Sequence, residues 1–264
     1  MGAENEVTAP TTPNLDIASL LPINFLMSTP SLPIGRRQIG RGHPRYTITE
    51  PSANHDTMLK WRKDDRKSVR IYSEAARRYG LDVRTLGWGS RASQLKRFEV
   101  LAGIGDLTGC RVLDVGCGLA DFYAWLRERG TRVRYTGLDV TPDLLAMARR
   151  RYPRLTFFEC GILDANAPKL GQFDYVFASG IFAHRRTAPV RFLHAAVNRM
   201  FSLAARGVAF NSLSKWAEQR DPGEFHACPV RTFEACRNFT GRLVLRHDYH
   251  PRDFTVYLYR EESK

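Results

Sequence analysis

Short apolar segments alternate with segments of helical periodicity from Cys110 onward, and this alternation most restricts the possible folds. Apolar runs predict strands at residues 111–115, 133–139, 155–160, 173–179 and 208–213. Helices are expected between them, at residues 121–129, 142–151 and 189–205. Repeated strand–helix–strand units place neighbouring strands parallel, with helices on both faces of the sheet. The sequence therefore predicts an α/β protein with a doubly wound sheet.

The last part of the chain follows a different pattern. Residues 242–247 and 254–259 are two further apolar segments, separated only by DYHPRD. A crossover between parallel strands needs about a dozen residues, so these two strands form an antiparallel hairpin. We therefore expect a sheet of about seven strands, mostly parallel, with an antiparallel strand near its C-terminal edge.

The chain divides into three segments by sequence pattern. Residues 1–55 are rich in Thr and Pro and lack periodicity, which predicts a disordered extension. Residues 56–105 are helical in pattern and are expected to form a lid on the substrate side. Residues 106–264 form the core. Within it, Thr141 is expected to cap the helix at 142–151, with Pro142 at its first position and arginines at its end.

The overall charge is strongly basic. Lys and Arg number 40 against 27 Asp and Glu, which gives a net charge of +13. Such a charge favours anionic ligands or nucleic acid, and both partners remain open. Five cysteines without a C-x-x-C pair argue against a disulfide framework or a metal site and favour a reducing compartment, the cytoplasm. No apolar run approaches the length of a membrane span.

The segment RVLDVGCGLADF, at residues 111–122, contains the strongest functional signal. A strand ends at Asp114, and Gly116 and Gly118 allow a sharp turn and a close approach to a ligand before the next helix. A dinucleotide site would have a third glycine where Asp121 stands. An acidic side chain there suits a ligand ammonium group better than a pyrophosphate. Asp139 ends the next strand, where a carboxylate can accept hydrogen bonds from ribose hydroxyls.

LDVGCGLAD, GLDVTPDLLAMARRRYP, FFECGILD and FDYVFASG together resemble the class I, Rossmann-like S-adenosylmethionine-dependent methyltransferases over about residues 95–260. The resemblance implies S-adenosyl-L-methionine as cofactor. It implies a loop from Asp114 through Gly116, Cys117 and Gly118 that cradles the methionine part, ribose binding by Asp139, and packing of Val140 on adenine. Gly161 stands where the family usually has an Asp that binds the adenine amine, so the N–H of Ile162 and the carboxylate of Asp164 are the alternatives. The fourth strand, which ends at Ser179, is implied to lie under the sulfonium.

The acceptor is restricted mainly by exclusion. Ser179-Gly180-Ile181-Phe182 lacks the N/D/S-P-P-Y/F motif of base amino-methyltransferases, and Cys228-Pro229 reverses the Pro-Cys pair of cytosine C5 enzymes. We therefore expect methyl transfer to an O or N atom of a small molecule. An RNA or protein methyltransferase, and a cofactor-binding regulator of the same fold, remain alternatives.

Several residues are candidates for the acceptor side of the site. His184 follows the fourth strand and is the candidate general base. Arg185 and Arg186 follow it and would favour an anionic acceptor. The expected lid adds Tyr72, Trp88 and Arg97, with Tyr79 and Gln94 as further contacts. No metal is expected.

Overall fold

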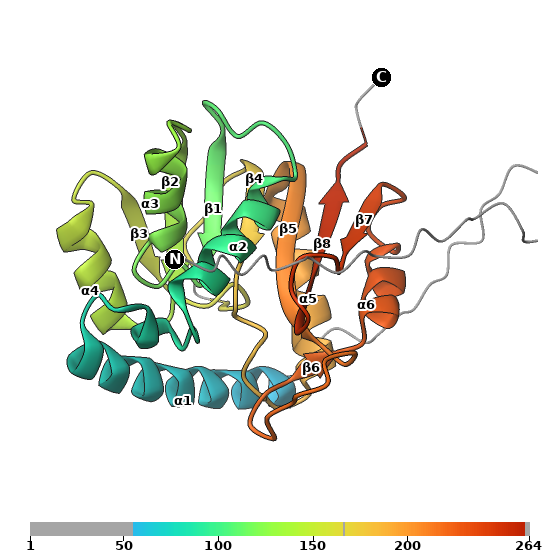
Figure 1. The fold of residues 1–264 in the computed structure, drawn as a ribbon, viewed down its shortest axis with the longest axis horizontal. Coiled ribbons are helices and arrows are strands. Elements are labelled where there is room, and N and C mark those ends of the chain that lie inside the picture. Colours follow the sequence, from blue (N-terminus) through green and yellow to red (C-terminus); the bar gives the residue numbers. More distant parts are fainter. Residues whose placement is uncertain (1–54, 166, 262–264) are drawn as a thin grey trace, which may run out of the picture. The chain divides into compact units, whose positions relative to one another are not determined.

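A computed structural model describes residues 55–165 and 167–261, all of which belong to a compact unit of residues 45–264 (Figure 1). The prediction of a disordered extension at residues 1–55 therefore lies almost wholly outside the described residues.

The described strands form an eight-stranded sheet in the order β3-β2-β1-β4-β5-β8-β7, with β6 paired to β5. The strands are β1 (Arg111–Val115), β2 (Arg134–Asp139), β3 (Thr156–Glu159), β4 (Phe173–Ala178), β5 (Ala204–Ser214), β6 (His226–Ala227), β7 (Leu243–Arg246) and β8 (Asp253–Tyr259). Strands β1 to β6 pair in parallel, whereas β8 is antiparallel to both β5 and β7. The expected sheet and its C-terminal hairpin are thus confirmed.

Helices cover both faces of this sheet (Figure 1). They are α1 (His55–Tyr79), the short 3₁₀ helix η2 (Val83–Leu86), α2 (Arg91–Ala102), α3 (Asp121–Glu128), α4 (Pro142–Arg151), α5 (Pro189–Leu203) and α6 (Pro229–Cys236). On one face, Phe98 of α2 and Trp125 of α3 pack with Val112 of β1. On the other, Leu193 of α5 packs with Leu113 and its neighbours. Alternate residues of β1 therefore enter opposite halves of the core, as a strand buried on both faces requires.

Helix α1 lies across the carboxyl ends of the parallel strands (Figure 1). It ends where expected, because Gly80 adopts φ +59° and donates its N–H to the Ala76 carbonyl. Trp61 anchors the other half of the helix: its indole N–H donates to the Thr187 carbonyl at 2.9 Å, and only 3% of the residue is exposed. The segment predicted to be a lid thus lies over the end of the sheet where α/β proteins bind ligands.

Two details differ from the sequence-based expectations. Thr141 occupies the N-cap position of α4, but its side chain makes no capping hydrogen bond. Its backbone N–H instead donates to the Asp139 carboxylate, which ties the start of α4 to the end of β2. No element was expected between residues 213 and 242, where β6 and α6 form. The first is two residues long and the second eight, too short for a periodic pattern.

Candidate functional site

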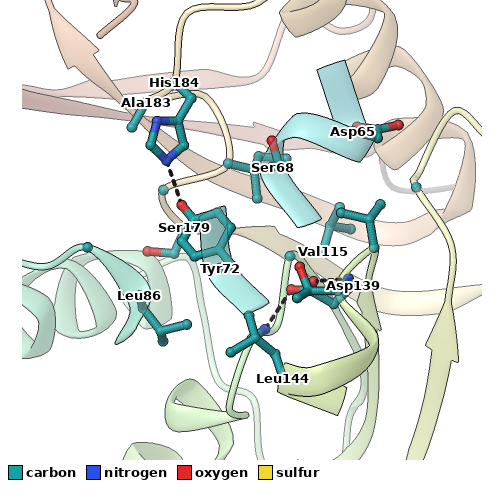
Figure 2. Close-up of a pocket in the computed structure, with 18 of the residues that line it drawn as sticks. Asp65, Ser68, Tyr72, Leu86, Val115, Asp139, Leu144, Ser179, Ala183 and His184 are labelled. Carbon is teal, nitrogen blue, oxygen red and sulfur yellow. Dashed lines mark hydrogen bonds between the residues drawn. The ribbon is translucent and has the colours of Figure 1, made fainter. Parts of the chain in front are cut away.

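A cavity of about 220 Å³ lies between α1 and the carboxyl ends of the parallel strands (Figure 2). Its walls come from α1, from η2 and the loop after it, and from the segments that follow β1, β2, β3 and β4. The polar or glycine residues that line it are Asp65, Ser68, Tyr72, Gly87, Gly116, Gly118, Asp139, Thr141, Gly161, Ser179, Gly180, His184, Arg186 and Glu224.

The glycine loop after β1 forms one wall. Gly116 and Gly118 adopt φ of +72° and +51°, a region that other residues rarely enter. The N–H groups of Gly116 and Cys117 both donate to the Leu138 carbonyl of β2, at 2.7 and 3.0 Å. A Cβ on Gly116 would overlap the Ile181 side chain. The loop is therefore fixed at the end of β2 and has no room for a side chain at position 116.

Asp139 joins this loop to the start of α4. One carboxylate oxygen accepts from the Gly118 N–H at 2.9 Å and the other from the Thr141 N–H at 2.8 Å (Figure 2). Burial raises the pKa of Asp139, while these backbone donors act in the opposite direction. Each oxygen keeps a second lone pair, so the carboxylate can still accept from a ligand hydroxyl.

Three residues predicted for the cofactor site do not line the cavity. Asp114 is buried on the α3 side of the sheet, where it accepts a hydrogen bond from the Tyr135 hydroxyl at 2.6 Å. Burial raises the pKa of Asp114 to about 7, and the Tyr135 bond partly opposes that shift. Cys117 is buried in the same half of the core, close to Gly137.

Asp121, the third, is neutralised by groups of this chain. Its carboxylate accepts from Arg151 at 2.9 Å and from the Gln94 amide at 3.3 Å, and Arg91 lies 3.9 Å away. Gln94, which was expected on the acceptor side, is therefore a buried partner of Asp121. None of these four residues lines the cavity.

The ends of β3 and β4 complete the cavity. Val140, Gly161 and Ile162 line it on the β3 side, as expected. Asp164 does not line it and pairs with Arg62 at 3.4 Å. Ser179 lines the β4 side, and its hydroxyl accepts from the side chain of Asn211, a buried residue of β5.

Tyr72 of α1 and His184 of the segment after β4 both line the cavity, and their side chains point toward each other (Figure 2). The Tyr72 hydroxyl and His184 Nε2 lie 2.9 Å apart. Burial lowers the pKa of His184, Lys67 and Arg186 lower it further, and the Glu224 carboxylate opposes them. Burial, with the nearby Asp139 charge, raises the pKa of Tyr72. At neutral pH the pair is therefore an uncharged imidazole beside an uncharged phenol.

Comparison with known proteins agrees with this arrangement. Residues 112–204, from β1 to the start of β5, match the family model described as "Methyltransferase domain". This segment contains the glycine loop, Asp139 and the end of β4. The matched segment places the core of this protein among the class I S-adenosylmethionine-dependent methyltransferases. It is therefore an enzyme that uses S-adenosylmethionine, as the sequence led us to expect.

The relatives of this methyltransferase are distant. The Mycobacterium tuberculosis protein Rv1506c, whose name includes methyltransferase, is 29% identical over 153 residues, which cover 54% of this chain and 89% of the relative. Magnesium-protoporphyrin O-methyltransferase of Rhodobacter capsulatus is 37% identical over 90 residues, 32% of this chain and 38% of the relative.

A solved structure shares the fold. Magnesium protoporphyrin IX methyltransferase from Synechocystis PCC 6803 aligns with a TM-score of 0.54 at 14% identity, over 80% of this chain and 99% of that one.

The remaining acceptor-side candidates of the methyltransferase lie in different places. Trp88 lines the cavity, whereas Arg97 is buried behind it, in an ion pair with Asp253 and 4.8 Å from the Trp88 ring. Tyr79 does not line the cavity; it stacks with Arg78 and Arg84.

The two adjacent arginines also differ from each other. Arg185 is exposed and does not line the cavity. Arg186 lines it, but its guanidinium pairs with Asp65 at 2.7 Å and lies 3.7 Å from the Phe192 ring. The structure therefore does not place the two guanidinium groups together, free to bind an acceptor, at the mouth of the cavity.

Sequence reasoning missed several cavity residues, chiefly Asp65, Ser68, Leu86, Leu144, Phe192 and Glu224. One signal was present: Asp64 and Asp65 are adjacent acids in an otherwise basic helix, and both turn inward. Asp64 accepts from the Thr187 N–H at 2.8 Å, and Asp65 pairs with Arg186.

Across residues 55–165 and 167–261, no cluster of His, Cys, Asp and Glu fits a metal ion. No helix in the same residues is long and apolar enough to cross a membrane.

Proposed function

We propose that this methyltransferase transfers a methyl group to an O or N atom of a small-molecule acceptor bound between α1 and the ends of β4 and β5. The observation that supports this proposal is the cavity itself, about 220 Å³ and covered by α1, with the His184–Tyr72 pair at one end. Named relatives fit a small acceptor: one acts on magnesium-protoporphyrin and another is a trans-aconitate 2-methyltransferase.

The residues of the cavity fit S-adenosylmethionine on the cofactor side. Gly116 and Gly118 leave a wall without side chains, where a bulky group would collide with Ile181 or Leu86. Asp139 has lone pairs for the ribose hydroxyls, and Val140, Gly161 and Ile162 form a narrow, mostly apolar wall for a flat base. Ser179 borders the place where the two ligands would meet. When bound, the cofactor supplies a methyl group already activated on a positively charged sulfur.

The protein's own contribution is mainly positional. An in-line displacement is accelerated when donor and acceptor are held in the correct geometry, and α1 covers the cavity in which the two would meet. We propose His184 as the group that receives the acceptor's proton, because its lowered pKa keeps the imidazole neutral and Tyr72 fixes its ring. Asp114, Cys117 and Asp121 act behind the cavity, where they support the glycine loop and α3.

The acceptor is identified by incubating the purified enzyme with cell metabolites and methyl-labelled cofactor, and by mass analysis of the labelled product. A labelled small molecule whose formation needs Asp139 supports the proposal. Label only in RNA or protein, or cofactor binding with no labelled product, contradicts it and favours the corresponding alternative. D139A is the variant that tests this requirement, and D143A is its matched control. Asp143 is half exposed, and its ion pair within the described residues is with Arg77.

One observation favours RNA as a second candidate acceptor. The exposed face of α1 has eight basic residues, Lys60, Arg62, Lys63, Arg66, Lys67, Arg70, Arg77 and Arg78, against the two acids Asp56 and Glu74. None of these eight residues lines the cavity, but they belong to the same helix as Asp65, Ser68 and Tyr72, which do, so they would bring phosphates close to the site. The variant K63E/R66E/R70E should abolish methylation of RNA if RNA is the acceptor, and should leave methylation of a small molecule intact.

The five cysteines are all free in the structure, which fits the cytoplasmic location that we propose.

A further inference from the structure

We propose that Asp65 of α1 binds the exocyclic amine of the adenine ring, so that the lid helix forms part of the cofactor site. This inference rests on the proposed function, because it takes the base to lie between Val140, Gly161 and Ile162.

The first argument is the position of the Asp65 carboxylate. The chain has no side chain at Gly161, immediately after β3. A Cβ built on Gly161 would lie 3.4 Å from Asp65 Oδ2 and 3.5 Å from Val140 Cγ1. The carboxylate of Asp65 therefore borders the space that a side chain at position 161 would enter, and both residues line the cavity.

The second argument is that this carboxylate is held in place from behind. Arg186 donates to Asp65 Oδ1 at 2.7 Å and to the Trp61 carbonyl at 3.2 Å. Its guanidinium packs 3.7 Å from the Phe192 ring, and its side chain is only 10% exposed. Arg186 thus fixes one carboxylate oxygen, while the other is directed at Gly161.

The third argument is chemical complementarity. Adenine presents an amine donor next to a ring-nitrogen acceptor. The Asp65 carboxylate can accept from the amine, and the backbone N–H of Ile162, which also lines the cavity, can donate to the ring nitrogen. A hypoxanthine base presents a carbonyl oxygen and an N–H instead, and mismatches both groups.

The other two carboxylates that line the cavity lie away from Gly161 and are placed for other contacts. Asp139 holds the Gly118 and Thr141 N–H groups. Glu224 pairs with Arg252 at 2.5 Å and lies beside His184, at the other end of the cavity. Among the described residues, Asp65 is therefore the carboxylate placed for the base.

The test compares two ligands, S-adenosyl-L-homocysteine and its inosine analogue S-inosyl-L-homocysteine, by calorimetry on the full chain. The ratio of their affinities measures recognition of the amine. Wild-type protein should prefer the adenosine ligand strongly. In D65A this preference should fall by about tenfold to a hundredfold, the usual effect of a hydrogen bond to a charged group.

Two further variants separate recognition from structure. D64A removes the neighbouring acid, which holds the Thr187 N–H but does not line the cavity, so the preference should stay at the wild-type value. G161D in the D65A background returns a carboxylate to the same space from the β3 side, and should restore part of the preference.

The outcomes are distinguishable. If wild-type protein binds neither ligand, the proposed placement of the cofactor is wrong, and this inference is wrong with it. If wild type binds S-adenosyl-L-homocysteine but D65A weakens both ligands equally, Asp65 only holds α1 and this inference alone is overturned. A selective loss for the adenosine ligand, restored by G161D, supports it.

Discussion

Asp114 and Asp139 end neighbouring strands, but their surroundings give them different roles. Asp139 lines the cavity and meets backbone donors on both oxygens. Asp114 faces the α3 side of the sheet and meets the Tyr135 hydroxyl. From the sequence alone, Asp114 could either bind the cofactor directly or support the glycine loop. Because Asp114 faces the α3 side of the sheet, the structure favours support of the loop.

Replacing Asp114 should change how stability depends on pH. Burial raises its pKa to about 7 in the folded chain, from 3.8 for a free carboxyl. Between these values the folded state keeps a proton that the unfolded state has lost, so stability falls as pH rises from about 4 to 7. D114N removes this contribution. In urea unfolding its stability relative to wild type should therefore increase by roughly 2–4 kcal/mol across that range. Parallel curves for the two proteins would contradict the assignment.

His184 should determine the acid limb of the activity profile if it receives a proton. Burial lowers its pKa below 6.5, so the neutral form persists down to mildly acidic pH. We expect kcat to be constant above pH 7 and to decrease only below about 6.5. H184Q should remove this limb and lower kcat about 10²–10⁴-fold with cofactor affinity unchanged. An unaltered profile in H184Q would exclude the imidazole as the base.

At the scale of elements, two loops meet at the site. The glycine loop after β1 contacts the segment after β4 through Gly116 and Ile181. Asn211 of β5 fixes that second segment, because its side chain bonds both the Ser179 hydroxyl and the Gly180 N–H. The position of each loop therefore depends on the other.

G116V tests this contact. A Cβ there overlaps Ile181, and φ of +72° is unfavourable for a β-branched residue, so the loop must move away from β2. Binding of S-adenosyl-L-homocysteine should be lost in calorimetry, while the far-ultraviolet circular dichroism of the sheet persists. G109A is the control, since Gly109 also has positive φ (+74°) but no atoms nearby. Normal binding by G116V would place the cofactor elsewhere.

The elements were predictable from sequence, but the lid contacts were not. Pro142, the arginines at the end of α4 and Gly80 are local signals, and the helix ends lie close to the predicted positions. Asp65 and Arg186 are 121 positions apart. Their pairing depends on where α1 crosses the sheet, which no local pattern encodes. For the same reason, the sequence predicted that Arg186 contacts an acceptor, whereas in the structure Arg186 pairs with Asp65 of α1.

Trp61 should control the docking of α1. Its ring packs edge-on against Phe192 at 5.5 Å, and its N–H reaches the Thr187 carbonyl. W61A should destabilise this docking by about 3–5 kcal/mol, so amide exchange in α1 should accelerate far more than in β1 or β4. I71A alters an exposed residue of the same helix. It should change neither the docking of α1 nor the rates of amide exchange. Equal acceleration in all elements would show that Trp61 supports the whole fold and not the lid alone.

At the scale of the molecule, the cavity joins α1 to the core. The described residues that line it fall between Asp65 and Glu224, so both α1 and the core contribute walls. The segment before α1 is rich in Thr and Pro. Such a composition offers little apolar surface to pack, so we expect this segment to be dispensable for the site.

A chain that begins at Ala53 should for this reason keep both cofactor binding and turnover. We expect its affinity for S-adenosyl-L-homocysteine to match that of the full chain. Ligand at 100 times its Kd should stabilise both proteins by about 2.7 kcal/mol, seen as equal increases in Tm. Because thermal shifts report only the cofactor side, turnover of the labelled acceptor is measured in parallel. If the shorter chain shows the same shift in Tm but loses turnover, residues 1–52 contribute to the acceptor side, and the prediction that they are dispensable is wrong.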